Sequence, residues 1–234
     1  MSIQAIKTAV KRNSNKTHAK LLQRFFKTGK GEYGEGDIFA GIKVPVLRQI
    51  AKANGDTSLS EIKELIKSPI HEERFISLVL LMDKYKHGTD EEREKIFRFY
   101  MENTKYINSW DLVDVSCPRI VGRHLYGRGE ELLVEMAKSS GLWKRRIGMI
   151  STMYFIDKGS FDTSFRIAEI LLRDEHDLIH KAVGWMLREI GKKDFGAELK
   201  FMKQHYHAMP RTMLRYAIEK FPEELRQQFL KGEI

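Results

Sequence analysis

The sequence predicts an all-α protein built as an α-solenoid of helical repeats. Apolar residues recur at helical spacing along most of the 234 residues, and alternation at period two is nearly absent. Prolines number only 5. Basic residues open four similar apolar segments at Arg74, Arg146, Lys181 and Arg215, and the gaps between them are 72, 35 and 34 positions. The first gap is about two periods, so a repeat of roughly 35 residues with two helices per unit is expected.

The first helices can be predicted one by one. Residues 17–27 carry leucines and phenylalanines at helical spacing, and residues 43–53 have Pro45 in a first-turn position before a stop at Asn54-Gly55. Residues 58–67 open with a capping box, in which Ser58 is followed three positions later by Glu61. Helices over 71–85 and 90–102 follow, and further helices complete the chain. No linker or low-complexity segment interrupts it, so a single domain over 1–234 is expected.

One glycine-rich segment, residues 28–37, interrupts the helical pattern and predicts a loop. Residues 29–34 spell G-x-G-x-x-G, but no strand precedes them, and Glu32 and Glu35 would repel a pyrophosphate. A dinucleotide site is therefore not expected, and the P-loop pattern is absent. The segment is either a flexible loop near a ligand or a plain surface connection.

The charge balance favours a polyanionic partner. Lys and Arg number 41 against 32 Asp and Glu, for a formal net charge of +9. A merely soluble surface is the alternative, because net charge does not reveal its distribution. The single cysteine, Cys117, excludes an intrachain disulfide and a cysteine-cluster metal site, and its apolar surroundings predict a small buried residue. No membrane span or secretory signal is apparent, so a reduced, cytoplasmic setting is expected.

Two tryptophans lie beside charged residues. Trp110 and Asp114 are four positions apart, so they share one face of a helix, whereas Asp111 lies about 100° away and faces elsewhere. Asn108 or Ser109 would cap that helix. The pair either presents an aromatic plate and a carboxylate to a ligand, or consists of a core tryptophan and half of an ion pair.

The second tryptophan, Trp185, lies beside a predicted buried stripe. That stripe consists of apolar residues at helical spacing, namely Ile179, Val183, Met186 and Ile190. Lys181, Gly184 and Arg188 fall on the face opposite the stripe. Trp185 is therefore either a stacking platform for a nucleotide or a side chain that fills the gap between neighbouring helices.

A third tryptophan, Trp143, precedes Lys144, Arg145 and Arg146. Because Arg145 and Arg146 cannot share a direction, one would reach phosphate while the other pairs internally. The histidines are scattered and no hydrolase or zinc signature occurs, so no metal or cofactor is expected.

Four blocks together resemble the AlkD-like DNA alkylation repair glycosylases, which are built from HEAT-like repeats. The blocks are in family order, within roughly residues 15–220, and read F-A-G-I-K-V-P-V-L-R at 39–48, S-W-D-L-V-D at 109–114, L-W-K-R-R at 142–146 and K-A-V-G-W-M-L-R-E at 181–189. The chain departs from the family at Ser109, where members have a second tryptophan, and at Phe25, where relatives can have tyrosine. Its Gly29–Gly36 loop is also longer than in some members.

The resemblance implies hydrolysis of the N-glycosidic bond of positively charged N3- and N7-alkylated purines in duplex DNA, without base flipping. It assigns Asp114 as the catalytic carboxylate, Trp110 and Trp185 as aromatic walls, and Arg146 as a basic contact on a concave basic face. Such a monofunctional enzyme needs no cofactor and no lyase chemistry, and a monomer is expected. Further DNA contacts are expected from basic and aromatic side chains, namely Lys144, Arg145, Lys181, Arg188 and Phe25.

Two other functions are consistent with the same residues. A related HEAT-like protein could bind damaged or branched DNA without excision, and an α-solenoid can serve as a protein–protein scaffold. The carboxylate of Asp114 argues against a pure DNA binder, because it would lie near phosphates. The basic excess argues against a scaffold.

Overall fold

The computed structural model describes residues 3–234, and this part of the chain is helical, as predicted, with no β-strand. A single parallel β-bridge joins Ile38 to Ile70. None of the helices in the described part is long and apolar enough to cross a membrane. The chain divides into two compact units, the first ending at Ser116 and the second covering Cys117–Ile234. The single domain over 1–234 stays a prediction.

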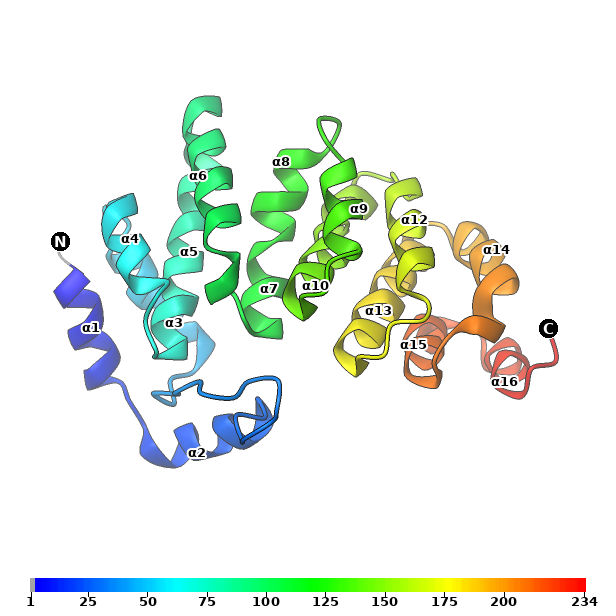
Figure 1. Ribbon diagram of the computed structural model, residues 1–234, viewed down its shortest axis with the longest axis horizontal. Helices are drawn as coiled ribbons and strands as arrows, with labels where there is room; N and C mark the ends of the chain where they lie inside the picture. The colour runs from blue at the N-terminus through cyan, green and yellow to red at the C-terminus, as the bar shows by residue number, and fades with distance from the viewer. Residues whose placement is uncertain (1–2) are drawn as a thin grey trace. The chain divides into compact units, whose positions relative to one another are not determined.

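The first unit is organised around one long helix (Figure 1). Its elements are α1 (Ile3–Arg12), α2 (Lys16–Phe25), α3 (Val44–Ala53), α4 (Leu59–Leu65), α5 (His71–His87), α6 (Asp90–Glu102), the 3₁₀ turn η1 (Thr104–Tyr106) and α7 (Trp110–Ser116). Helix α5 packs against α1, α3, α4, α6 and α7. Because neighbours surround it, α5 buries charged residues at its first turn as well as its apolar ones.

The second unit repeats this plan around another helix of the same length, α13, which has 17 residues like α5. Helix α13 packs against α10, α11, α12, α14 and α15. The elements are the π-helical turn η2 (Pro118–Gly122), α8 (Arg123–Leu125), α9 (Glu131–Ala137), α10 (Leu142–Ser151), α11 (Met153–Asp157), α12 (Asp162–Leu171), α13 (Asp177–Lys193), α14 (Phe195–His205), the 3₁₀ turn η3 (Tyr206–Ala208), α15 (Arg211–Ala217), the 3₁₀ turn η4 (Ile218–Lys220) and α16 (Glu223–Lys231).

Local signals in the sequence place the early helices well. Helix α6 has the predicted bounds, and α3 begins directly after Lys43 with Pro45 in its first turn. The capping box of α4 forms, because Ser58 accepts the Glu61 N–H while the Glu61 carboxylate accepts the Ser58 N–H. The predicted stripe of α13 is fully buried. Cys117 is buried, as expected.

Ser109 occupies the N-cap position predicted for α7, but neither its side chain nor that of Asn108 caps the helix. Ser109 precedes the helix, and its carbonyl accepts the Val113 N–H at 3.1 Å. Its hydroxyl, however, is buried without a hydrogen-bond partner. The Asn108 amide instead donates to Asp37 at 3.4 Å. A side-chain cap of α7 is therefore a wrong prediction for both residues, because Ser109 is drawn into the interior and Asn108 turns towards the glycine-rich loop.

Candidate functional site

Trp110 begins helix α7 and lies at the end of a stack of four rings. Its indole stacks on Phe26 at 5.0 Å between centroids and 13° between planes. Phe26 stacks on Phe39 at 4.9 Å, and Phe39 stacks on His71 at 4.3 Å. Phe25 contacts the indole edge-on at 5.9 Å and is 64% exposed. The stack therefore runs from a half-buried tryptophan to a buried histidine and holds the indole in one orientation.

His71, at the inner end of the stack, lies between two carboxylates. Its Nε2 lies 2.8 Å from Asp111 Oδ2, and its Nδ1 lies 3.1 Å from Asp37 Oδ2. Arg74 donates to both oxygens of Asp37 at 2.7 Å. Burial opposes the charged imidazole. The negative charge of Asp111 and the hydrogen bonds that the ring donates to Asp111 and Asp37 outweigh burial and raise the pKa of His71 to about 9. Burial likewise opposes ionisation of Asp37, yet His71 and Arg74 lower its pKa.

A carboxylate of α5, that of Glu72, fixes the loop that supplies Phe39 and Asp37. The buried Glu72 accepts the N–H groups of Ala40, Gly41 and Ile42 at 2.8, 2.7 and 3.2 Å. Gly41 has a φ of +83°, and a Cβ there would lie 2.2 Å from the Asn15 carbonyl oxygen. The loop therefore needs glycine at this position to pass under the start of α2.

The glycine-rich part of the same loop engages its own carboxylates. Glu32 accepts the Gly29 N–H and Glu35 accepts the Gly31 N–H, both at 2.8 Å. The G-x-G-x-x-G segment thus turns two of its backbone donors towards its own glutamates. The predicted loop is confirmed, and the absence of a pyrophosphate site stays a prediction.

Asp114 lies one turn after Trp110 on α7 and is half-buried. The spacing of four residues puts the two side chains on the same side of the helix. Asp111 points to α5, as the predicted angle of about 100° from Trp110 requires. Asp111 thus points into the unit, whereas Asp114 lies on the side of α7 that carries Trp110.

In the second unit, Trp185 is half-buried on α13, and its Nε1–H donates to Glu189 at 2.9 Å. Glu189 also accepts from Lys192 at 2.6 Å. Two predicted DNA contacts of the same helix form ion pairs, Lys181 with Asp177 at 2.8 Å and Arg188 with Glu219. The G-W-M-L-R-E block is thus largely engaged in contacts within its own unit.

Gly184 departs from its predicted surroundings. The sequence placed it on the face opposite the buried stripe, but it is buried, and a Cβ there would lie 2.5 Å from both the Met213 carbonyl oxygen and Tyr216 Cβ. Helix α15 therefore covers this side of α13, and the glycine serves close packing.

The basic residues that follow Trp143 are arranged differently from the prediction. Arg145 donates to Asp174 at 2.6 Å and to the carbonyl of Ser140 at 2.8 Å. Arg146 is buried and donates to the Leu178 carbonyl. Both arginines therefore have internal partners, where one was expected to point outwards, and Lys144 is the exposed residue of the three.

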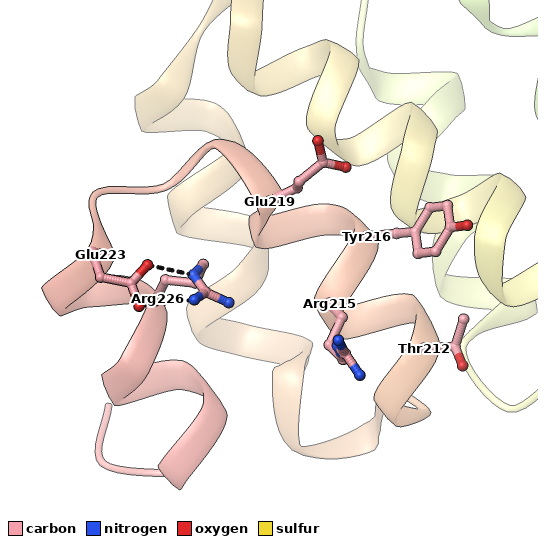
Figure 2. A pocket seen from close by; sticks show the side chains of 6 residues that line it. All are labelled: Thr212, Arg215, Tyr216, Glu219, Glu223 and Arg226. Carbon is pink, nitrogen blue, oxygen red and sulfur yellow. Dashed lines mark hydrogen bonds and ion pairs between the residues drawn. The ribbon is translucent and has the colours of Figure 1, made fainter.

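A polar hollow of about 670 Å³ lies at the C-terminal end of the second unit (Figure 2). Its lining residues come from α15, η4 and α16, and they are Thr212, Arg215, Tyr216, Glu219, Glu223 and Arg226. Arg226 donates to both oxygens of Glu223 at 2.8 Å. Arg215, which begins the last predicted repeat, contributes an exposed guanidinium.

The sequence did not single out Asp37, His71 and Arg74 as parts of the site around Trp110. They meet because the loop before α3 returns to the first turn of α5, and Asp37 and Asp111 lie 34 and 40 positions from His71. A pairing at such separation leaves no local pattern. Within residues 3–234, no group of three or more His, Cys, Asp and Glu side chains has the arrangement of a metal site.

Comparison with known proteins identifies a family. Residues 6–221 match a family model described as DNA alkylation repair enzyme. A solved structure titled "Predicted DNA alkylation repair enzyme from Enterococcus faecalis" has a similar fold, with a TM-score of 0.68 and 17% sequence identity. That match covers 90% of this chain and 98% of the other. No curated protein sequence matches the chain significantly.

Proposed function

Because this chain belongs to the DNA alkylation repair enzyme family, we propose that it is a DNA glycosylase that removes N3- and N7-alkylated purines from duplex DNA. The Trp110–Asp114 pair of α7 is the observation that carries the proposal. An indole held by a stack of rings lies one helical turn from a half-buried carboxylate. In a protein that only bound DNA, a carboxylate near the phosphates would oppose binding.

The chemistry of the lesion suits this pair. Alkylation at N3 or N7 gives the purine a positive charge, so the base leaves as a neutral molecule without an acid. The bond between the base nitrogen and C1′ breaks with its electron pair going to the base, and the sugar acquires oxocarbenium character. The carboxylate of Asp114 stabilises this cation and orients a water molecule, whose oxygen bonds to C1′ while one of its protons passes to the carboxylate. The face of Trp110 favours the same cation through its ring quadrupole.

The finer assignment is to the AlkD-like group, with HEAT-like repeats forming an α-solenoid and a concave basic face. In this proposal the enzyme contacts the deoxyribose and backbone of the lesion without turning the nucleotide out of the duplex. Trp185 supplies a further aromatic contact. Phosphates are met by basic side chains, of which the exposed Lys144 is the simplest candidate.

Internal partners constrain the other proposed contacts. Lys181 and Arg188 reach phosphate only by sharing or leaving Asp177 and Glu219. Arg145 is held by Asp174 in the same way. Arg146 is buried, so we propose that it supports α13 through the Leu178 carbonyl and acts on DNA indirectly.

The test is release of free base from duplex DNA that carries N7-methylguanine. Wild type is compared with Asp114→Asn, and Asp83→Asn serves as the matched control because Asp83 is exposed on α5. We expect release well above spontaneous depurination for wild type and the control, and a loss of about 100-fold or more for Asp114→Asn.

Two outcomes would contradict parts of the proposal. Equal release of base by wild type and Asp114→Asn would support the glycosylase activity but exclude the proposed catalytic role of Asp114. Binding of the damaged duplex without release by any variant would indicate a non-catalytic DNA-binding protein.

A further inference from the structure

The cluster beneath Trp110 joins three separate elements through one histidine ring. Asp37 comes from the loop before α3, His71 and Arg74 from α5, and Asp111 from the first turn of α7. His71 and Asp37 are 3% and 7% exposed, so the contacts are shielded from water. The ring that links the two carboxylates is also the inner member of the stack that supports Trp110.

The geometry fixes the protonation state of His71. Each ring nitrogen faces a carboxylate oxygen, and an ionised carboxylate can only accept hydrogen bonds. Asp37 is held as an acceptor by Arg74. A neutral imidazole has one N–H, so it would turn a lone pair towards one of the two carboxylates. Only the imidazolium donates to both.

The charges of the cluster balance when His71 is protonated. Asp37 and Asp111 are negative, and His71 and Arg74 are positive. Loss of the His71 proton would leave a net negative charge in a buried place, and one contact would become repulsive. A pocket of about 240 Å³ lies beside the cluster and is lined in part by His71 and Asp111. The other charged or titratable groups that line it are Glu72, which accepts three loop N–H groups, and Lys43 and His18 from the elements alongside.

We propose that His71 is a positioning residue whose imidazolium holds the first turn of α7, and with it Trp110, against the loop and α5. Trp110 rests on the stack that ends at His71, and Asp111 is the next residue along the chain. Asp114 follows on the same short helix, so its placement depends on the same anchor. The consequence for catalysis rests on the proposed glycosylase function. Deprotonation of His71 should release the first turn of α7 and lower the rate of base release at alkaline pH.

The first experiment measures the protonation of the His71 ring and the fluorescence of the Trp110 indole in the absence of DNA. The protonation of His71 is titrated by NMR of ¹⁵N-labelled histidines and assigned with His71→Gln. In parallel, Trp143→Phe/Trp185→Phe leaves Trp110 as the only tryptophan for fluorescence. We expect both signals to change with a midpoint near the His71 pKa of about 9.

Asp111→Asn separates charge from shape. The amide keeps the size of the side chain and can still accept the Nε2–H, but it removes the negative charge that favours the imidazolium. We expect both midpoints to move to lower pH in this variant and to stay in place in Asp83→Asn. A Trp110 signal that does not change with the His71 titration would overturn the proposal, as would a midpoint unchanged in Asp111→Asn.

The second experiment measures single-turnover base release against pH. Wild type should lose rate above a pH near 9, by about ten-fold for each further pH unit, as expected for one essential proton. The loss should begin at lower pH in Asp111→Asn. A profile without this loss, or one that Asp111→Asn leaves unchanged, would overturn the catalytic role of His71. If wild type releases no base at any pH, the proposed function fails, while the NMR and fluorescence titrations still decide whether His71 positions Trp110.

Discussion

At the scale of single residues, Gly184 decides how closely α13 can pack on α15. A methyl group there would lie 2.5 Å from backbone and Cβ atoms of α15, which cannot move aside as a flexible side chain could. We therefore expect Gly184→Ala to lower the free energy of unfolding by roughly 1–3 kcal/mol through overpacking. Urea unfolding checks this value. Gly129→Ala is the control, because its nearest heavy atom would lie 3.6 Å away, and an equal loss in both variants would contradict the explanation.

Glu198 is a residue whose burial makes the free energy of unfolding depend on pH. It lies on α14, is 2% exposed, and its Oε1 has no hydrogen-bond partner. Burial raises the pKa of Glu198 to about 8. The unfolded chain ionises this group near its ordinary pKa of 4.5, so between these values the folded state holds the extra proton. Its stability must therefore fall as pH rises, by roughly 1.4 kcal/mol for each pH unit.

Glu198→Gln should remove this dependence. We expect the free energy of unfolding of wild type to decline more steeply than that of the variant from about pH 5 to pH 8. Chemical unfolding at several pH values gives both slopes. Glu175→Gln, which changes an exposed carboxylate of the same unit, should keep the wild-type slope. Parallel slopes for wild type and Glu198→Gln would show that Glu198 is already ionised in the folded protein.

At the scale of elements, the loop before α3 depends on one carboxylate of α5. Glu72 accepts three consecutive N–H groups, and Glu72→Gln would turn an amide donor towards at least one of them. We expect a loss of about 1–3 kcal/mol in stability and faster hydrogen exchange at Ala40, Gly41 and Ile42. Exchange measured by NMR or mass spectrometry checks this. Glu64→Gln on the exposed side of α4 is the control, and unchanged exchange in the loop would contradict the anchoring role.

Elements whose causes are local could be predicted from the sequence. The capping box of α4 needs only Ser58 and Glu61, and the buried stripe of α13 follows from spacing on one helix. The side of α7 that carries Trp110 and Asp114 follows from the same spacing. These features depend on residues at most eleven positions apart along one helix, so the periodicity of the helix is sufficient to find them.

Features that depend on distant partners could not be predicted in this way. Asp111 was correctly predicted to face away from Trp110. Its partner His71, however, lies 40 positions earlier in the chain, and a pairing at that distance leaves no local pattern. The family resemblance assigned Arg146 as a basic contact to DNA, yet its side chain is buried and donates to the Leu178 carbonyl. Gly184 was placed on the face of α13 opposite the buried stripe. The α13 sequence alone does not show that α15 packs against that face.

At the scale of the whole molecule, the formal charge of +9 has a consequence for DNA binding. Each phosphate neutralised by the protein releases counterions, so affinity for duplex DNA should fall linearly on logarithmic axes between about 50 and 200 mM salt. We expect Lys144→Gln to reduce the slope by about 1. Phe25→Ala should weaken binding with the slope unchanged, because it removes an exposed ring and no charge. Fluorescence anisotropy measures both, and a slope near zero for wild type would contradict DNA as the partner.

The hydrogen bond between Trp185 and Glu189 limits what Trp185 can offer to another molecule. The indole has a single polar hydrogen, and Glu189 already accepts it. A ligand that approaches this side chain therefore meets a flat, electron-rich face and no donor. Such a face can distinguish charged from uncharged groups and flat from bulky ones, but it cannot read the pattern of donors and acceptors on a base edge. Contacts made at Trp185 should be indifferent to nucleotide sequence.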